Sequence, residues 1–321
     1  SKTGVAQPYL GPITASVFES AWNFTAGTLG NVTSSVQWRA PYLNTTLPYP
    51  TILFGPGGGG PPSIAYTTLL SELASQGYTV AAVDHPYEQP FLQYPSANGS
   101  GPYGGPQIYG LPVVYSFNTS FFNQLYDMRV RDFSAFIDYF PSLAAELRAP
   151  FNTKHFGIFG HSLGGASALG ALLQHPRNKV LGSVNLDGLL TGDPAGNDTA
   201  KADAKKPVML LGQEIHTPAN EGTWGAFPRA QTGWWREVLV NGSMHLDFSD
   251  ATIWKELGRN DAPDVGSIDG SRMVSITRAF VTAFFDKLSG ERGAVLQGPS
   301  RKWSEANFVG SYDGNKTCAC I

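Results

Sequence analysis

The stretch KHFGIFGHSLGGASALGALL, residues 154–173, constrains the fold more than any other part of the chain. A short apolar run, typical of a buried strand, leads directly into GHSLG at residues 160–164, and small residues follow over the length of a helix. A serine between glycines at such a junction occupies a sharp turn, where a larger flanking side chain would collide with the strand or the helix. The pattern therefore predicts a strand, a tight turn that exposes Ser162, and a helix over residues 163–174.

The same alternation of strand and helix continues along the chain. Further strands are expected in the run TILF and at residues 78–85, 180–188, 207–214 and 236–245, and further helices at 63–76, 119–147 and from Met273 to about Gly290. Alternating strands and helices favour a mostly parallel central sheet with helices on both faces, as in the α/β-hydrolase fold. With no repeat and no clean linker, residues 1–321 are predicted to form one domain, in which residues 1–47 are antiparallel edge strands.

The strand, turn and helix around Ser162 have the pattern of a nucleophile elbow. A serine hydroxyl is a weak nucleophile and needs a general base, for which the chain offers six histidines. In this fold the base follows the serine in the sequence, which argues against His85 and His155. His245, after the strand VLVNGSMH, is the predicted base, whereas His216 is expected at the surface or the rim of a pocket.

Two acidic residues could orient the imidazole of His245. Asp187 ends the strand after the elbow helix, and Glu214 ends the next strand, the commoner position in this fold. Asp247 lies too near His245 in the sequence to brace it easily. The residues alone leave Asp187 and Glu214 as equal alternatives.

An ester-hydrolysing serine also needs two backbone N–H groups that bind the negatively charged oxygen of the tetrahedral intermediate. One is expected from Leu163, directly after Ser162. The other is expected from the glycine-rich loop GPGGGG at residues 55–60, where the backbone can approach a substrate closely. A phosphate-binding loop is the competing interpretation, but no lysine follows at the required spacing.

Two long segments interrupt the alternation of strands and helices, at residues 86–117 and 215–235. Loops of this length inside a domain are usually functional or disordered, so both are predicted to lie near the active site. The second segment brings Trp224, Trp234 and Trp235. These tryptophans are expected either to line the substrate pocket or to pack in the core.

Composition excludes several classes of partner. Charged residues make up 15% of the chain and the net charge is -3, with no basic block, so no nucleic-acid partner is expected. No apolar run approaches the roughly 18 residues of a transmembrane helix. Cys318 and Cys320 can pair with each other or stay free. The predicted chemistry needs no cofactor and no metal.

Asn-X-Ser/Thr triplets favour a secreted, extracellular glycoprotein. The chain holds eight of them, more than expected at this length, and it begins at Ser1, which looks like a mature sequence. Asn241 is expected to be unmodified or partly modified, because it lies on the strand that leads to His245. The other seven are candidates for glycosylation: Asn23, Asn31, Asn44, Asn98, Asn118, Asn197 and Asn315.

Four blocks of the sequence resemble the platelet-activating-factor acetylhydrolase family of secreted and lipoprotein-associated phospholipases A2, in its fungal branch. They are LFGPGGGG, LASQGYTVAAVDHPYE, FGIFGHSLGGASALG with VNLDGLL, and NGSMHLDFSD, within residues 50–250. The resemblance implies that Asp187 rather than Glu214 is the acid. It also implies that the second oxyanion amide lies within Gly58 and Gly59.

The sequence therefore predicts a secreted serine esterase that acts through Ser162, His245 and Asp187 and an acyl-enzyme. Low charge and aromatic loops favour an apolar, short-acyl ester as the substrate. The resemblance implies glycerophospholipids with short or oxidised acyl chains. With no transmembrane segment expected, any contact with a lipid surface is expected to be transient. Cutinase-like or polyester hydrolysis is the alternative, because those enzymes share the elbow. A catalytically silent binding protein is less favoured, since such proteins usually lose a member of the triad and this chain keeps all three.

Overall fold

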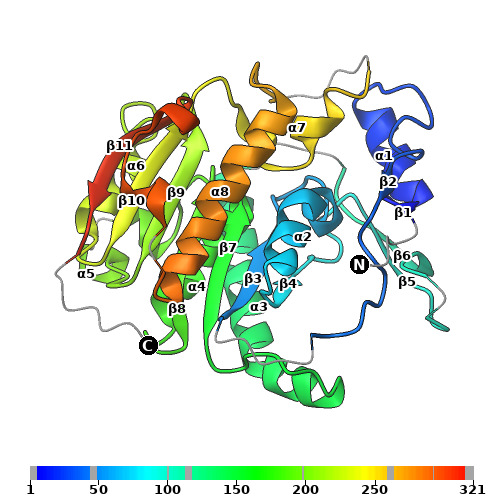
Figure 1. Cartoon of the computed structure of the whole chain (residues 1–321), viewed down its shortest axis with the longest axis horizontal. Coiled ribbons are helices and arrows are strands. Elements are labelled where there is room, and N and C mark those ends of the chain that lie inside the picture. The colour runs from blue at the N-terminus through cyan, green and yellow to red at the C-terminus, as the bar shows by residue number, and fades with distance from the viewer. Residues whose placement is uncertain are drawn as a thin grey trace.

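The computed structural model describes residues 6–43, 49–99, 101–112, 118–196, 199–258, 264–291 and 293–314. Its centre is a seven-stranded sheet with the strand order β11-β10-β9-β8-β7-β3-β4 (Figure 1). The strands are β3 (Thr51–Gly55), β4 (Val80–Ala82), β7 (Phe156–His161), β8 (Val180–Leu186), β9 (Val208–Gln213), β10 (Trp235–Val240) and β11 (Ala306–Tyr312). Neighbouring strands are parallel except β10 and β11, which confirms the mostly parallel sheet expected from the alternation.

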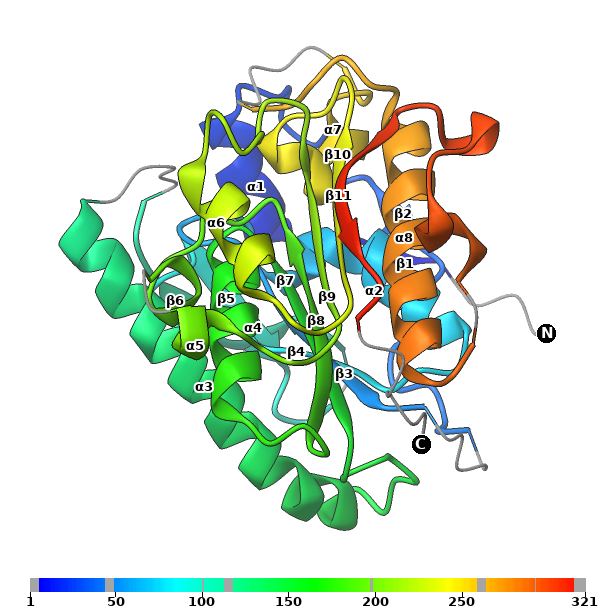
Figure 2. The same cartoon turned by 90° about the vertical axis from the view of Figure 1, so that its left-hand side faces the viewer.

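Helices cover both faces of this sheet (Figure 2). Alternate residues of one strand face opposite layers, so that Ile52 and Phe54 pack in one apolar layer and Leu53 in the other. The first layer is covered by α1 (Pro12–Ala21), α2 (Thr67–Ser75), α7 (Ala251–Trp254) and α8 (Gly270–Leu288). The second is covered by α3 (Thr119–Glu146), α4 (Leu163–Gln174), α5 (Thr199–Ala202) and α6 (Gly222–Ala230). Burial on both faces explains why the strands are continuous apolar runs.

The two long helices begin at capping side chains. Asn118 accepts a hydrogen bond from the backbone N–H of Phe121 at 2.9 Å, and Asp269 accepts one from that of Arg272 at 2.7 Å. In the described part of the chain, no helix is both long and apolar enough to cross a membrane.

The N-terminal segment differs from its prediction. Residues 1–47 were expected to form edge strands, but their described part contains α1 and a separate two-stranded sheet of β1 (Gln7–Pro8) and β2 (Thr33–Ser34). A proline in the first turn favours the helix, and Phe18 and Trp22, one turn apart, pack their rings against Trp254. This aromatic packing outweighs the weak strand pattern of the serines and threonines.

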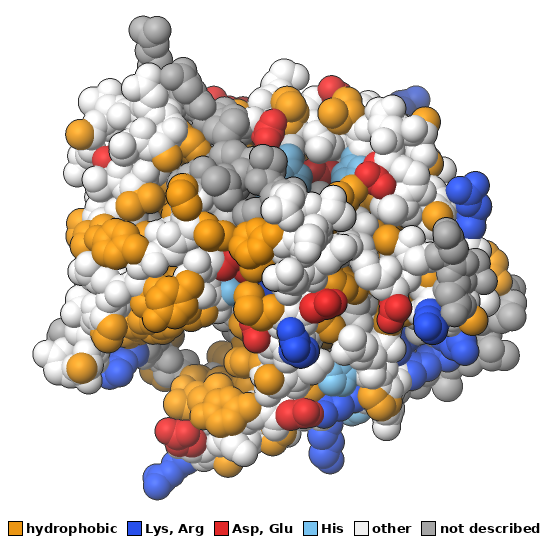
Figure 3. Space-filling model, turned by 180° about the vertical axis from the view of Figure 1, so that it is seen from behind, with side chains coloured by type: hydrophobic (Ala, Val, Ile, Leu, Met, Phe, Trp, Pro, Cys, Tyr) orange, Lys and Arg blue, Asp and Glu red, His pale blue; other side chains and the backbone are white. Residues whose placement is uncertain are grey.

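The interrupting segments also contain regular structure. Residues 86–117 include an antiparallel pair, β5 (Phe91–Pro95) and β6 (Gly104–Tyr109), outside the central sheet, and residues 215–235 include α6. Hydrophobic side chains reach the surface on the face shown in Figure 3. Tyr94 of β5 and Tyr109 of β6 are among the exposed large hydrophobic residues. The edge strand β11 was not predicted.

Candidate active site

Ser162 occupies the sharp turn between β7 and α4. Its backbone is in the left-handed half of conformational space, with φ 56° and ψ −126°, which is strained for a residue with a side chain. A Cβ on Gly160 would lie 2.4 Å from the backbone carbon of Gly164, and one on Gly164 would lie 2.1 Å from the carbonyl oxygen of Gly55. Both glycines are therefore required by close packing. Ser162 lies at the N-terminus of α4, where the helix dipole favours negative charge.

The carboxylate of Asp187 lies directly after β8 and is almost fully buried. Its Oδ2 accepts hydrogen bonds from His245 Nδ1 at 2.6 Å and Gln213 Nε2 at 3.0 Å. Its Oδ1 accepts from His216 Nδ1 at 2.8 Å and from the backbone N–H of Gln213 at 2.8 Å. Burial alone would raise the pKa of Asp187, but the hydrogen bonds from His216 and His245 outweigh it and hold the pKa well below its usual range. The group is a carboxylate with all its acceptor positions used.

His245 begins a short 3-10 turn, η3 (His245–Phe248), soon after β10. Its side chain is 27% exposed and lines the same cavity as Ser162. Because Nδ1 donates to the Asp187 carboxylate, Nε2 is the unprotonated nitrogen of the neutral ring. The structure thus brings together the predicted serine, histidine and acid at the carboxyl ends of β7, β8 and β10.

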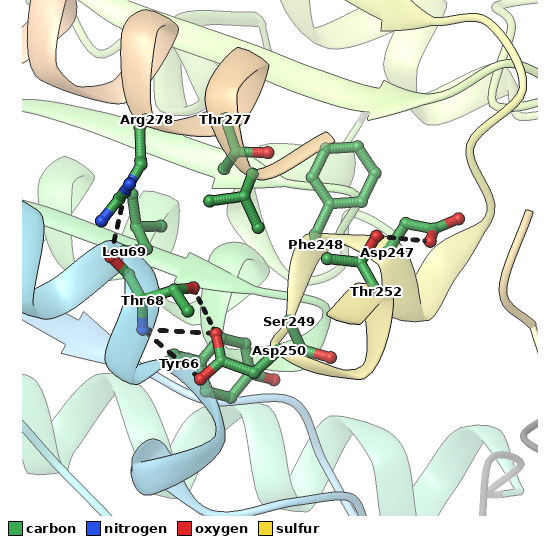
Figure 4. Close-up of a pocket in the computed structure, with 11 residues that line it drawn as sticks. Tyr66, Thr68, Leu69, Asp247, Phe248, Ser249, Asp250, Thr252, Thr277 and Arg278 are labelled. Atoms are coloured by element: carbon green, nitrogen blue, oxygen red, sulfur yellow. Dashed lines mark hydrogen bonds between the residues drawn. The ribbon is translucent and has the colours of Figure 1, made fainter. Parts of the chain in front are cut away.

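The turn that holds His245 is anchored by two buried aspartates. Asp247 accepts hydrogen bonds from the backbone N–H groups of Met244 and Gly266 at 2.8 and 2.6 Å, and from Lys255 Nζ at 2.8 Å. Asp250 accepts from both the backbone and the hydroxyl of Thr68 on α2 (Figure 4). The cavity drawn there has a volume of about 10 Å³, room for one water, so it is no substrate site.

A chain of hydrogen bonds links this turn to the glycine-rich loop. The buried His161 bonds the carbonyl oxygen of His245 through Nε2 at 2.9 Å and the hydroxyl of Tyr66 through Nδ1 at 2.8 Å. That hydroxyl accepts the backbone N–H of Gly57 at 3.2 Å. Burial, with the nearby charge of His245, lowers the pKa of His161 to about 3, so the ring stays neutral and donates only through Nε2. Sequence reasoning assigned no role to Tyr66 or to the His161 ring.

A buried ion pair holds the other side of the glycine-rich loop. Arg129 of α3 donates Nε to Glu88 at 2.9 Å, and its remaining nitrogens reach the carbonyl oxygens of Pro56 and, at 3.2 Å, Gly57. Arg129 and Glu88 are 0% and 2% exposed. Sequence reasoning missed this pair too, because its members are 41 residues apart and no spacing in the sequence links them.

The glycine-rich loop passes beside the start of α4. A Cβ on Gly58 would lie 2.9 Å from Leu163 Cδ2, so a side chain there would press into Leu163. Gly58 and Leu163 both line the cavity at Ser162, whereas Gly59 has φ +62° and turns the chain. Gly58 and Leu163 therefore lie at the same cavity as Ser162, and their role as oxyanion donors stays a prediction.

The cavity at Ser162 has a volume of about 390 Å³. Its lining mixes apolar groups with hydroxyl and amide groups, and Asp264 lies among them as an acidic side chain. The described residues around it are Gly58, Thr119, Phe122, Asn123, Ser162, Leu163, Leu189, Leu190, Thr191, His245 and Asp264. Apolar side chains with a few polar groups suit a small ester more than a highly charged molecule.

None of the three predicted tryptophans is among the described residues that line this cavity. Trp224 is fully buried, where it stacks under His216 at 4.0 Å and donates Nε1 to the carbonyl oxygen of Gly188 at 2.9 Å. Trp234 packs on Phe284, and Trp235 lies on β10 against Gly310. Of the two alternatives, pocket lining is wrong for these three residues, and core packing is confirmed for Trp224 and Trp234, which are buried, while Trp235 is partly buried against the core.

Glu214, the alternative acid, is exposed and accepts the backbone N–H of Gly242 at 2.7 Å. His216 was expected at the surface or a pocket rim, but its side chain is only 10% exposed and bonds Asp187. The positions of Glu214 and His216 have one cause. The turn after β9 folds back over the Asp187 carboxylate, so that His216 faces the carboxylate and Glu214 faces outward.

The predicted glycosylation sites are at the surface wherever they are described. The side chains of Asn23, Asn31, Asn98 and Asn118 are exposed. Asn241 is exposed as well, because β10 ends at Val240, so the expectation that the ladder buries it is wrong. Three further sites lie outside the described residues, as do both cysteines: Asn44, Asn197, Asn315, Cys318 and Cys320.

The fold and the elbow define the class of this protein. Residues 52–302 match the model of the alpha/beta hydrolase family, and the chain belongs to that family. Among solved structures, a ferulic acid esterase from Streptomyces cinnamoneus superimposes with a TM-score of 0.78 at 28% sequence identity, covering 97% of this chain and 86% of that one.

Two curated relatives confirm the resemblance to platelet-activating-factor acetylhydrolases. A probable 1-alkyl-2-acetylglycerophosphocholine esterase from Arthroderma benhamiae is 26% identical over 274 residues, which cover 81% of this chain and 66% of that protein. The platelet-activating factor acetylhydrolase of Cavia porcellus is 25% identical over 279 residues, which cover 81% of this chain and 62% of that protein. The chain thus spans slightly less than two thirds of the length of both relatives.

Proposed function

We propose that the protein is a secreted serine esterase that hydrolyses carboxylic esters through Ser162, His245 and Asp187. The observation that carries the proposal is the 2.6 Å hydrogen bond between His245 Nδ1 and a buried carboxylate, with His245 and the strained Ser162 lining one cavity. The names of the relatives and of the structural neighbour support ester hydrolysis. The exposed glycosylation triplets support secretion.

In the proposed reaction, His245 Nε2 takes the proton from Ser162 Oγ as that oxygen attacks the ester carbonyl carbon. The backbone N–H groups of Leu163 and Gly58 stabilise the resulting oxyanion. The alcohol leaves with the proton from His245, and the acyl group stays on Ser162. Water, deprotonated by the same imidazole, then releases the acid and restores the serine.

Two substrate classes have support. Short-acyl glycerophospholipids are favoured by the two relatives named for acetylated glycerophosphocholine, and a cavity of about 390 Å³ suits a short acyl chain. Esters of ferulic acid are favoured by the structural neighbour, which covers almost the whole chain. Parallel assays on a short-acyl phospholipid, methyl ferulate, p-nitrophenyl acetate and a polyester film would rank these classes, including the cutinase-like alternative.

A fluorophosphonate probe tests the chemistry directly, because it reacts with activated serines. The wild-type protein should be labelled at Ser162, and Ser162→Ala should lose both labelling and turnover, by on the order of 10⁴-fold or more, while keeping its fold. Retained turnover in the purified variant would refute the mechanism. A folded wild-type protein that neither reacts with the probe nor turns over any of the esters would favour a silent binding protein.

A further inference from the structure

Asp187 bonds two histidines, one through each carboxylate oxygen. His245 Nδ1 lies 2.6 Å from Oδ2, and His216 Nδ1 lies 2.8 Å from Oδ1. The proposed reaction uses His245 alone. His216 is not among the described residues that line the cavity at Ser162, so its largely buried imidazole has no role in that reaction.

The surroundings of His216 fix its ring in one orientation. The ring stacks on Trp224 with centroids 4.0 Å apart and an interplanar angle of 27°. Trp224 is itself held by the hydrogen bond from Nε1 to the carbonyl oxygen of Gly188, the residue after Asp187. A Cβ on Gly212 would lie 2.8 Å from the Trp224 ring and 3.2 Å from Asp187 Oδ1, so a glycine is needed where these groups meet.

The orientation of the Asp187 carboxylate matters because its backbone is strained. Asp187 has φ 54°, an uncommon conformation for a residue with a side chain. Its hydrogen bonds must hold the plane of the carboxylate so that Oδ2 meets His245. The backbone N–H of Gln213 fixes Oδ1 from one side, and His216 supplies the second bond to the same oxygen.

We infer that His216 is a positioning residue, which acts on the esterase reaction through the N–H that it donates to Asp187 and not through contact with the substrate. The inference rests on the proposed function, because it assigns the role of Asp187 to orienting His245. It predicts that the N–H donor matters for turnover, whereas the stacked ring does not.

Two substitutions separate these features of His216. His216→Phe keeps a ring on Trp224 and removes the donor, whereas His216→Asn keeps an N–H close to the position of Nδ1 and removes the ring. With p-nitrophenyl acetate, His216→Phe should lower kcat by about 10- to 100-fold, the range for one lost hydrogen bond to a charged group. Its KM should stay within about twofold, and His216→Asn should keep kcat within about threefold. Thermal unfolding of both variants checks that they fold.

Two results would overturn the inference: wild-type kcat in His216→Phe, or a greater loss in His216→Asn than in His216→Phe, which would assign the role to ring packing. Failure of the proposed function would be seen elsewhere, as a wild-type protein that the fluorophosphonate does not label. Proton NMR decides the inference in that case as well. The low-field resonance of His245 Nδ1–H should move in His216→Phe and stay in place in His216→Asn, and an unmoved resonance in His216→Phe would refute the positioning role.

Discussion

Replacing Asp187 by asparagine tests how the site sets the protonation state of His245. An asparagine side chain presents one carbonyl oxygen and one NH₂ group in place of two equivalent oxygens. The backbone N–H of Gln213 donates to Oδ1 and cannot become an acceptor, so the asparagine oxygen must take that position. The NH₂ group then takes the place of Oδ2 and faces His245 Nδ1.

The consequence for His245 follows from that geometry. An NH₂ group requires an acceptor, so Nδ1 must lose its proton and Nε2 must carry one instead. A protonated Nε2 cannot take the proton of Ser162. Turnover should therefore fall by about 10⁴-fold, which corresponds to about 5.5 kcal/mol of transition-state free energy. The bond from His216 to the retained oxygen stays intact, so Asp187→Asn should fold.

The assay compares kcat/KM on p-nitrophenyl acetate for the wild type, Asp187→Asn and Glu214→Gln. The control is suited because Glu214 is exposed and accepts only a backbone N–H in the described structure. It should stay within about threefold of the wild type, as surface substitutions usually do. Nitrogen-15 NMR of the His245 ring reports the tautomer itself. An Asp187→Asn protein within tenfold of wild-type activity, or a larger loss in Glu214→Gln, would refute the reasoning.

Three further predictions concern a buried ion pair, a buried carboxyl group and an exposed glycosylation triplet. Arg129→Met should lower the free energy of unfolding by about 3–5 kcal/mol, because it leaves Glu88 charged and buried. Adding Glu88→Gln should restore thermal stability. It should not restore kcat/KM, because the carbonyl oxygens of the glycine-rich loop still lack the hydrogen bonds from Arg129. Burial raises the pKa of Glu237 to about 7, so its ionisation destabilises the fold as pH rises through 7. Glu237→Gln should therefore raise the free energy of unfolding more at pH 8 than at pH 5, by about 1–3 kcal/mol, seen as a larger rise in Tm at pH 8, and an equal gain at both pH values would contradict it. Asn241 is exposed, so protein made in a glycosylating host should carry sugar there, and an unmodified Asn241 in peptide mass mapping would be the contrary result.

The elements that the sequence predicted well are those with strong local constraints. The strand, turn and helix around Ser162 need glycines where a Cβ would meet backbone atoms at 2.1–2.6 Å. Both of these glycines fall within the five consecutive residues 160–164, so the sequence shows the requirement directly. The strands of the parallel sheet are buried on both faces and therefore read as apolar runs. By contrast, α1 has a weak pattern of its own and is held by rings of Trp254, which are more than 230 residues away in the sequence.

The same reasoning explains which site residues the sequence could not predict. The serine, the histidine and the acid follow three successive or nearly successive strands, so parallel pairing brings them to one edge of the sheet. The bond from His216 to Asp187 depends on how one turn folds, and the Arg129–Glu88 pair depends on how α3 crosses the glycine-rich loop. Such contacts leave no periodic or spaced pattern in the sequence.

A path of hydrogen bonds connects the proposed oxyanion loop to the proposed base. It runs from the backbone of Gly57 through Tyr66 and His161 to the carbonyl oxygen of His245. The glycine-rich loop supplies the proposed oxyanion amide and the turn after β10 supplies the proposed base, and among the residues that the structure describes no backbone ladder connects the two. Burial lowers the pKa of His161 to about 3, so its ring stays neutral and can keep one tautomer while His245 takes and returns the proton of Ser162 in the proposed reaction. The path therefore holds the oxyanion loop and the base together while the base takes and returns a proton in the proposed reaction, which is the arrangement that electrostatic stabilisation of a transition state requires.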